Sequence, residues 1–224
     1  MATIIAPSIL SADFSHLADE VQRISDAGAE YIHLDIMDGS FVPEITIGAP
    51  VVKSLRKYSD AVFDVHLMVE HPETQIKSFA NAGADIITFH AETTNHAHRL
   101  IQQIHELGLK AGVAINPGTS LSMIEELVED AEMILIMTVN PGWGGQKFIE
   151  SQLGKIHMLF HMIQEMETEC DIAVDGGINP ETSVDVREAG ANILIAGSAI
   201  FGAEDIAQAI KDIRGKEIHH HHHD

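Results

Sequence analysis

The feature that most constrains the fold is a glycine-centred hexapeptide that recurs along the chain. It reads AGAEYI from Ala27, AGADII from Ala82 and AGANIL from Ala189, with a looser echo, LGLKAGV, from Leu107. Each copy follows an amphipathic stretch and leads into a run rich in β-forming residues. Glycine tolerates the left-handed conformation that ends many helices. The repeat therefore predicts a unit of helix, glycine stop and strand, with the stops at Gly28, Gly83, Gly108 and Gly190.

Eight β-type runs alternate with helical patterns, which predicts an α/β fold of the (β/α)8 TIM-barrel type. The rival arrangement is an open, doubly wound sheet, but no GxGxxG follows the first run. The predicted strands are Ile4–Ser8, Tyr31–Met37, Ala61–Met68, Ile86–His90, Ala111–Asn116, Met133–Asn140, Ile172–Asp175 and Ile193–Gly197. The predicted helices are Phe14–Ala27, Pro72–Ala82, His96–Leu107, Leu121–Glu129, Gln152–Glu167, Glu181–Ala189 and Ala203–Ile213, with a short helix opening in GSAIFG.

The length and composition suit one globular domain. The chain has 224 residues, 45% of them hydrophobic, which is enough to bury a sizeable core. We expect residues 1–218 to form a single barrel domain and His219 to Asp224 to be an expression tag. No apolar run approaches the ~18 residues that span a bilayer. The single cysteine, Cys170, allows no intrachain disulfide, so we expect a cytoplasmic protein.

The chain is strongly acidic, and this limits its partners. Its formal net charge is −21, from 34 acidic and 13 basic residues. Nucleic acids and anionic membranes are bound mainly by basic surfaces, so we expect the protein to bind neither. An anionic small molecule would need local hydrogen-bond donors rather than the field of the whole protein.

Polar residues end nearly every predicted strand. In a barrel, the carboxyl ends of the strands and the loops after them form one face, where active sites are built. A single polar strand end means little, but polarity at all eight predicts a site on this face. The residues concerned are Ser8, His33 with Asp35, His66, His90, Asn116, Asn140, Asp175, and Gly197 with Ser198.

Side-chain alternation brings four of these residues to one place. His33, Asp35 and Met37 share a face of one strand because successive side chains point to opposite sides. Asp64, His66 and Met68 share a face of the next strand in the same way, and Asp175 ends the seventh. Two imidazoles and two carboxylates suit a divalent transition metal such as zinc, iron or manganese. A purely structural hydrogen-bond network is the alternative, and His90 and Asn116 are candidates for supporting roles. Met37, Met68 and Met137 could equally be core filler.

Three glycine-rich loops predict an anion site. NPGWGGQKF follows the sixth strand, a glycine pair follows the seventh, and GSAIFG follows the eighth and opens a short helix. Backbone N–H groups in such loops can surround an anion, and barrels often bind phosphate after strands seven and eight. This would let an acidic protein hold a phosphate. The glycines are Gly142, Gly144, Gly145, Gly176, Gly177, Gly197 and Gly202.

With these motifs in hand, the chain resembles the ribulose-phosphate 3-epimerase family. The resemblance covers nearly the whole chain, and it implies a metal-dependent barrel that interconverts D-ribulose 5-phosphate and D-xylulose 5-phosphate. The stretches that carry it are APSILSADF (Ala6–Phe14), HLDIMDGSFVP (His33–Pro43), DVHLMV (Asp64–Val69), NPGWGGQKF (Asn140–Phe148), VDGGINPET (Val174–Thr182) and GSAIFG (Gly197–Gly202).

The resemblance also implies roles for individual residues. His33, Asp35, His66 and Asp175 would hold one divalent metal ion, with zinc as the first choice and iron, manganese or cobalt as alternatives. Asp35 and Asp175 would be the two acid/base groups that exchange protons through a cis-enediolate. The enzyme would form a homo-oligomer. The residues implied to contact the sugar phosphate are Ser8, His66, Met37, Met68, Met137, Gly142, Trp143, Gly144, Gly145, Gly176, Gly177, Gly197 and Ser198.

Some positions depart from the family's usual pattern, and other functions stay open. Trp143 stands where phenylalanine is common, Ala173 replaces a polar residue, and Gly118 replaces alanine. A related 3-epimerase of a six-carbon ketose phosphate, such as allulose 6-phosphate, is the alternative function. A non-catalytic sugar-phosphate-binding barrel and a metal-free barrel of the tryptophan-biosynthesis type are further alternatives. We expect Asp38, just after the second strand, to form a turn or to support the site residues, and not to act as a third acid.

Overall fold

The structure, a computed structural model, describes residues 2–216 and forms a single-domain (β/α)8 barrel. Eight parallel strands form one sheet in the order β1-β8-β7-β6-β5-β4-β3-β2. A parallel bridge between Ser8 and His33 joins β2 back to β1 and closes the ring. The predicted tag lies outside the described residues. The strands are β1 Ile4–Pro7, β2 Tyr31–Met37, β3 Val62–Met68, β4 Ile86–His90, β5 Lys110–Ile115, β6 Met133–Met137, β7 Asp171–Asp175 and β8 Ile193–Ala196, which confirms all eight predictions to within a few residues.

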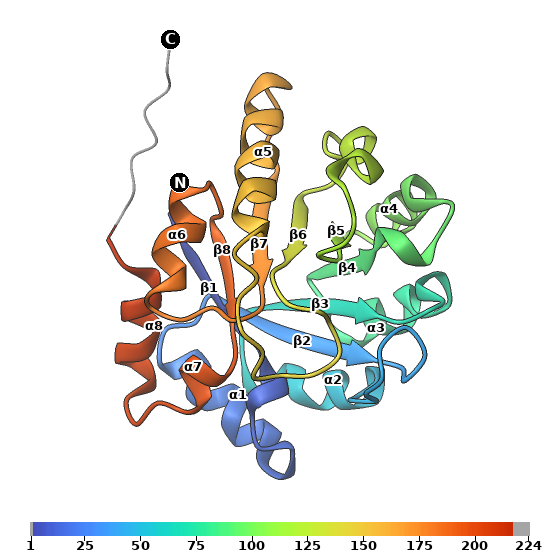
Figure 1. The fold of residues 1–224 in the computed structure, drawn as a ribbon. Helices are drawn as coiled ribbons and strands as arrows, with labels where there is room; N and C mark the ends of the chain where they lie inside the picture. Colours follow the sequence, from blue (N-terminus) through green and yellow to red (C-terminus); the bar gives the residue numbers. More distant parts are fainter. Residues whose placement is uncertain (1, 217–224) are drawn as a thin grey trace.

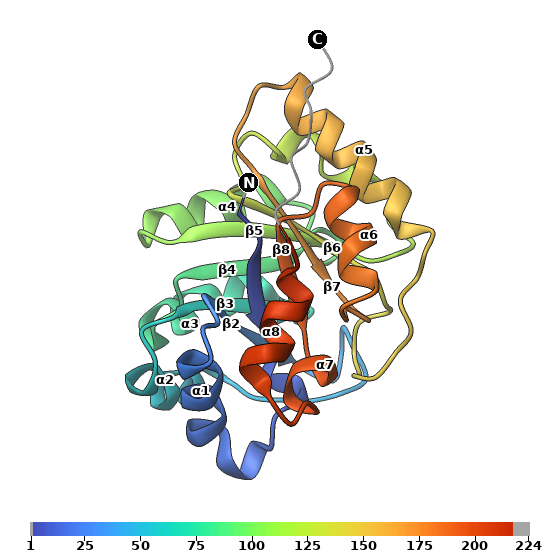
Figure 2. The same cartoon turned by 90° about the vertical axis from the view of Figure 1, so that its left-hand side faces the viewer.

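The helices surround the sheet (Figures 1 and 2). The predicted stops Gly28, Gly83, Gly108 and Gly190 all have positive φ, between 77° and 117°, so the repeat marks helix ends as expected. The α-helices are α1 Leu17–Asp26, α2 Ala49–Leu55, α3 Ile76–Ala82, α4 Ala97–Glu106, α5 Gln152–Glu165, α6 Thr182–Glu188, α7 Ser198–Phe201 and α8 Ile206–Arg214. The 3-10 turns are η1 Ile9–Ser11, η2 Phe14–His16, η3 Arg56–Tyr58, η4 Pro72–Thr74, η5 Ala91–Thr93, η6 Leu121–Met123 and η7 Glu125–Leu127.

One helix prediction was wrong, and one helix was not predicted. The segment from Leu121 to Glu129 is not an α-helix but two 3-10 turns, η6 and η7. Its buried residues are Leu121, Ile124, Leu127 and Val128, a spacing that also fits one face of an α-helix, so the pattern alone did not distinguish the two helix types. Helix α2 was missed because its valines favour strands. The sequence signal for it was Pro50 in the first turn, where proline is well tolerated in a helix.

The barrel interior is mostly apolar, and its buried polar residues lie from the middle of the strands to their carboxyl ends. Outward-facing strand residues such as Ile32 and Leu34 belong to the core between the barrel and its helices. A smaller apolar cluster inside the barrel includes Tyr31, Ile86 and Met133, near the starts of their strands. Buried apolar side chains therefore lie below the polar residues at the strand ends. Such a layer excludes water and strengthens the electrostatic interactions above it.

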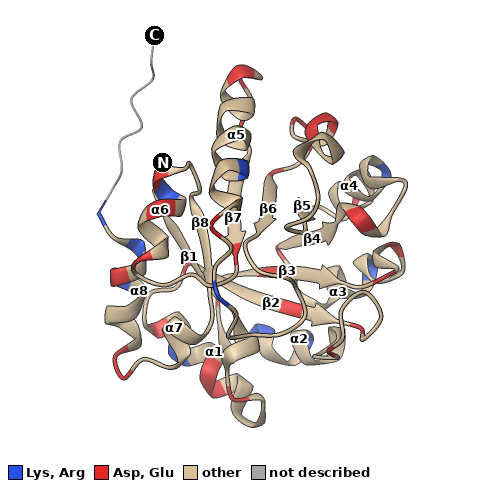
Figure 3. Ribbon diagram, in the orientation of Figure 1, with Lys and Arg blue, Asp and Glu red and all other residues tan. Residues whose placement is uncertain are grey.

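Acidic residues are spread over the helices and loops (Figure 3). They outnumber basic ones, as the net charge of −21 requires. Among residues 2–216, no helix combines the length and the apolar character that crossing a membrane requires. Cys170 is buried, and burial raises the pKa of its thiol to about 12, so the thiolate is scarce at neutral pH.

Gly112 on β5 provides a test of the packing inside the barrel. A Cβ at this position would overlap Thr88 Oγ1 and lie 3.0 Å from Thr88 Cβ and 3.1 Å from Met133 Cε. We expect Gly112→Ala to lower the free energy of unfolding by about 1–3 kcal/mol through overpacking. Gly118→Ala is the control, because its Cβ would meet nothing within 4 Å. Chemical denaturation measures the free energy of unfolding of both variants and of the wild-type protein. Equal values for Gly112→Ala and the wild-type protein would contradict the prediction.

Candidate active site and metal centre

Two histidines and two aspartates converge at the carboxyl ends of β2, β3 and β7. The register of β2 and β3 places Asp35 beside His66 and His33 beside Asp64. His33 Nε2 lies 3.1 Å from Asp35 Oδ1, 3.2 Å from His66 Nδ1 and 3.5 Å from Asp175 Oδ2. His66 Nδ1 lies 3.1 Å from Asp35 Oδ1 and 3.7 Å from Asp175 Oδ2. The four residues that the alternation pattern selected thus meet around one point.

Further hydrogen bonds fix these side chains from behind. His33 Nδ1, the ring nitrogen that faces away from the cluster, lies 2.8 Å from Asp64 Oδ2. Ser8 Oγ donates to Asp35 Oδ2. These contacts leave His33 Nε2 and Asp35 Oδ1 facing the middle of the cluster. The sequence reasoning placed Asp64 on the right face of its strand but did not select it, although the DVH spacing was the signal.

Burial and charge oppose each other in this cluster. Burial disfavours a charged His33, but the carboxylates of Asp35 and Asp64 outweigh it and raise the pKa of His33 well above its usual range. Burial likewise disfavours ionised Asp35 and Asp175. Their contacts with the two imidazoles outweigh that cost and lower the pKa of both carboxyl groups. Without a metal, a protonated His33 therefore compensates buried negative charge, a task that a metal cation can take over.

The donor set fits a divalent metal ion. One ligand atom from each of His33, Asp35, His66 and Asp175 lies within 4.8 Å of the other three, and this is the one such group in residues 2–216. Imidazole nitrogens and carboxylate oxygens face one another across this space, a mixture that zinc and similar metals bind. The buried cluster could therefore hold a metal ion.

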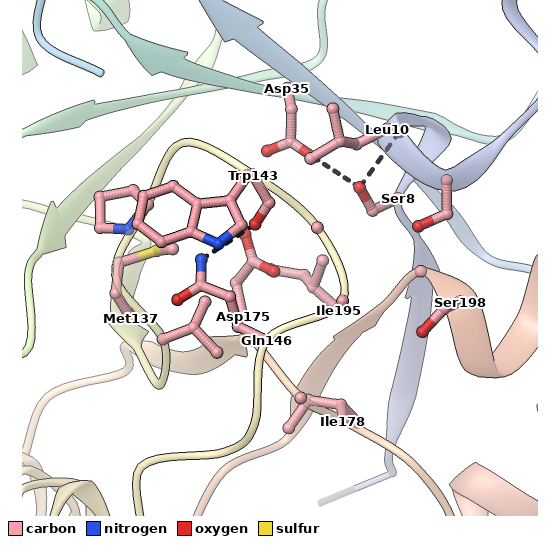
Figure 4. Close-up of a pocket in the computed structure, with 18 of the residues that line it drawn as sticks. Ser8, Leu10, Asp35, Met137, Trp143, Gln146, Asp175, Ile178, Ile195 and Ser198 are labelled. Atoms are coloured by element: carbon pink, nitrogen blue, oxygen red, sulfur yellow. Dashed lines mark hydrogen bonds between the residues drawn. The ribbon is translucent and has the colours of Figure 1, made fainter. Parts of the chain in front are cut away.

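A cavity of about 420 Å³ opens above the cluster (Figure 4). Asp35 and Asp175 reach its wall, whereas His33 and His66 are fully buried beneath it. Of the residues expected to contact a substrate, only His66 does not line the cavity. Those that do are Ser8, Met37, Met68, Met137, Gly142, Trp143, Gly144, Gly145, Gly176, Gly177, Gly197 and Ser198.

Two of the lining glycines allow loops to pass closely. Gly176 has a φ of +129°, and a Cβ there would lie 2.7 Å from the backbone nitrogen of Val139. Gly177 has a φ of +66°, and its Cβ would lie 2.6 Å from the backbone nitrogen of Phe148. Because only glycine fits both the conformation and the space, the loop after β7 can pack against the loop after β6.

The loop between β6 and α5 covers one side of the cavity. Gln146 Nε2 donates to the carbonyl oxygens of Asn140, at 2.5 Å, and Trp143, at 3.0 Å. These two hydrogen bonds within the loop stabilise its conformation. The Trp143 side chain is half exposed and lies on the cavity wall beside Met137 (Figure 4). The larger ring at this position, noted as a departure from the family pattern, thus stands at the mouth of the cavity.

Asp38 forms a turn, as the sequence predicted. Its Oδ1 accepts hydrogen bonds from the backbone N–H groups of Ser40, at 2.9 Å, and Phe41, at 3.0 Å. Its Oδ2 accepts from the N–H of Glu70 at 2.8 Å, which ties the loop after β2 to the loop after β3. With both oxygens engaged by backbone donors, the pKa of Asp38 is lowered even though burial opposes this.

Comparison with known proteins identifies the family. Residues 4–201 match the ribulose-phosphate 3 epimerase family. The ribulose-phosphate 3-epimerase of Bacillus subtilis (strain 168) is 51% identical over 214 residues, which cover 95% of this chain and 99% of that protein. This chain belongs to the ribulose-phosphate 3-epimerase family. Another member, the chloroplastic enzyme of Arabidopsis thaliana, is 51% identical over 216 residues, covering 96% of this chain and 77% of its own.

Solved structures agree on the fold. KGPDC from Streptococcus mutans superposes with a TM-score of 0.72 over 96% of each chain, although only 16% of the residues are identical. A 3-hexulose-6-phosphate synthase superposes with a TM-score of 0.67 at 18% identity, covering 95% of this chain and 98% of the other. At this level of identity the similarity concerns the barrel alone. Both the epimerase-family resemblance and the barrel predicted from the sequence are therefore confirmed, and the chain is an enzyme of this family.

The contact between His33 and Asp64 leads to a testable prediction. Asp64→Asn keeps the size of the side chain but removes the charge that orients the outer ring nitrogen of His33. Replacing such a partner of a metal-binding histidine typically weakens metal affinity about 10–100-fold. We expect a loss of this size in zinc affinity, measured on tag-free protein by competition with a chromogenic chelator. An unchanged affinity would contradict the prediction.

Proposed function

We propose that this protein interconverts D-ribulose 5-phosphate and D-xylulose 5-phosphate by inverting carbon 3. The observation that carries the proposal is a pair of carboxylates, Asp35 and Asp175, that reach one small-molecule cavity from β2 and β7. Counted through β1 and β8, these strands are three apart round the closed barrel. Membership of the family supports the choice of substrate.

Two carboxylates suit an inversion better than one. In the proposed reaction one aspartate removes the proton from carbon 3, and a cis-enediolate forms between carbons 2 and 3. The other aspartate then donates a proton to the opposite face, because a single base would tend to return the proton to the side it came from. Each turnover thus leaves the first carboxyl protonated and the second ionised, and exchange with solvent resets them.

His33, Asp35, His66 and Asp175 would hold one divalent metal ion, with zinc proposed first and iron, manganese or cobalt as alternatives. When bound, the ion supplies Lewis-acid stabilisation of the negative charge that develops on the substrate oxygens. The two histidines keep their ligand nitrogens turned to the centre through the contacts on their other nitrogens. Ser8 holds Asp35 in place by donating to its Oδ2.

The methionines suit the reacting carbons. Met37, Met68 and Met137 line the cavity beside Asp35 and are buried. Their thioethers present no acidic proton, so they would not quench a carbanion-like intermediate, and they would keep bulk water away from it. Next to them, Asp35 and Asp175 would be the carboxyl groups that exchange protons with the substrate.

The glycine loops would receive the phosphate. Gly177, Gly197 and Ser198 line the same cavity, and Ser198 begins helix α7. Backbone N–H groups in these loops can hold phosphate without a basic side chain, which agrees with the acidic composition. The proposed substrate would thus lie with its phosphate near α7 and its carbon 3 between the two aspartates.

Neutralising either aspartate tests the two-base assignment. We expect Asp35→Asn and Asp175→Asn each to lower kcat by about 10²–10⁴-fold, the usual contribution of general acid–base catalysis. Asp171→Asn is the matched control, since Asp171 begins the strand that Asp175 ends and its Oδ1 accepts from Asn192 Nδ2. Circular dichroism checks the folding of all three. Near-normal turnover in either site variant would refute the assignment.

Substrate and metal are tested together on tag-free protein. Turnover in heavy water is expected to place solvent deuterium at carbon 3 of ribulose 5-phosphate, because the proton is exchanged through the bases. Activity should fall on removal of the metal by a chelator and return with zinc, iron, manganese or cobalt. Allulose 6-phosphate, assayed side by side, is expected to react more slowly. A lack of exchange would point instead to a sugar-phosphate-binding protein without catalysis.

We further propose that residues 1–218 form the catalytic barrel domain. The homo-oligomeric state and the cytoplasmic location expected from the sequence remain predictions alongside it. The proposed partner is a small sugar phosphate, in keeping with the cavity of about 420 Å³. The net charge of −21 does not favour a nucleic acid as a partner.

A further inference from the structure

His90, at the end of β4, contacts the metal centre from outside. Its Nε2 lies 2.8 Å from His66 Nε2, and the two rings stack with centroids 5.0 Å apart and an interplanar angle of 21°. Both rings are fully buried. Two ring nitrogens at this distance share a single proton, so one of them donates and the other accepts.

The surroundings of His66 decide the direction of this hydrogen bond. His66 Nδ1 faces the ligand cluster, 3.1 Å from Asp35 Oδ1 and 3.2 Å from His33 Nε2. A nitrogen that binds a cation carries no proton, so the proton of His66 resides on Nε2 and is donated to His90. His90 Nε2 is then the acceptor, and the proton of its neutral ring resides on Nδ1.

Glu92 lies at the outer end of this chain of groups. Its Oε2 is 3.5 Å from His90 Nδ1. Both atoms are buried, and within residues 2–216 neither has a hydrogen bond to any other group. Glu92 Oε1 is anchored separately, because it accepts from the backbone N–H of Asn116 at 2.5 Å and from Thr119 Oγ1 at 3.2 Å. The carboxylate is therefore fixed with one oxygen toward the proton on His90.

We propose that Glu92 is a positioning residue for the metal centre, which acts through His90 to keep His66 in the tautomer that binds metal through Nδ1. The inference rests on the proposed metal dependence. It gives each histidine ligand a carboxylate on its outer side: Asp64 contacts His33 directly, and Glu92 reaches His66 through one intervening ring. Such partners hold the tautomer and ring orientation of metal-binding histidines.

Glu92→Gln is the sharpest substitution, because glutamine has one acceptor where this site uses two. If its oxygen faces Asn116 N–H, its NH₂ group points at the proton on His90. If it faces His90, its NH₂ group meets Asn116 N–H instead. The first arrangement favours His90 with its proton on Nε2. The second removes the hydrogen bond from Asn116 N–H that holds the side chain of residue 92. In both cases His66 is less strongly held in the tautomer protonated on Nε2.

Glu132→Gln is the matched control. Glu132 also accepts from a backbone N–H, that of Ala111 at 2.7 Å, and from a histidine, His105 Nε2 at 3.0 Å. It precedes β6, at the amino end of the strands, so it is remote from the metal cluster. The two variants share the same chemical change, and only one of them lies on the proposed connection to the metal.

The test measures zinc affinity on tag-free, metal-stripped protein by competition with a chromogenic chelator. We expect Glu92→Gln to weaken zinc binding about 10–100-fold and Glu132→Gln to leave it unchanged. Nitrogen-15 NMR of the histidine rings in the zinc-loaded wild-type protein is expected to show His90 protonated on Nδ1 and His66 on Nε2. This second measurement needs no variant, so it can overturn the proposal even if Glu92→Gln fails to fold.

Each outcome has a clear meaning. A His90 ring protonated on Nε2, or equal zinc affinities in wild-type protein and Glu92→Gln, overturns the role of Glu92 and leaves the proposed function standing. A Glu92→Gln protein that loses thermal stability but keeps its zinc affinity shows a purely structural role and overturns it too. Wild-type protein that binds no zinc or other divalent metal overturns the metal dependence and this inference together.

Discussion

Everything at the carboxyl face of this barrel depends on how buried carboxylates are compensated. Asp35, Asp64 and Asp175 surround two imidazoles at the end of an otherwise apolar interior, and none of these charges would be stable alone. The arrangement holds because each carboxylate contacts a histidine nitrogen, and each histidine uses both of its nitrogens. The same mutual dependence leaves a centre that attracts a cation and holds the carboxyl groups of Asp35 and Asp175 at the wall of the cavity.

The second constraint is that the proposed substrate is an anion, whereas the chain itself is strongly acidic. With a net charge of −21, the overall field would repel a sugar phosphate at a distance. Backbone N–H groups act only over short range, so the glycine loops can bind phosphate without changing that field. Specificity for the phosphate would then come from the shape of the loops, and Gly176 and Gly177 contribute to that shape because they let the loop after β7 pass close to Val139 and Phe148.

The sequence predicted the strands and the convergence of His33, Asp35 and His66 well, because both follow from the two-residue period of a β-strand. Once His33, Asp35 and His66 are on one face, closure of the barrel brings them together. The sequence did not single out Glu92, because its contact with His90 depends on the loop that follows β4. The second helix and the 3-10 turns after β5 were missed for a related reason: packing against neighbours overrode the local preferences of the valines and leucines.

The bridge between Ser8 and His33 has a consequence for how the protein is made. Ser8 comes from the first strand and Asp175 from the seventh, so a chain emerging from the ribosome carries half of the site long before it can complete the other half. Until β7 and β8 arrive, the barrel stays open and its acidic groups face water. The proposed site can therefore form only after the strand that carries Asp175 has been made and has joined the sheet.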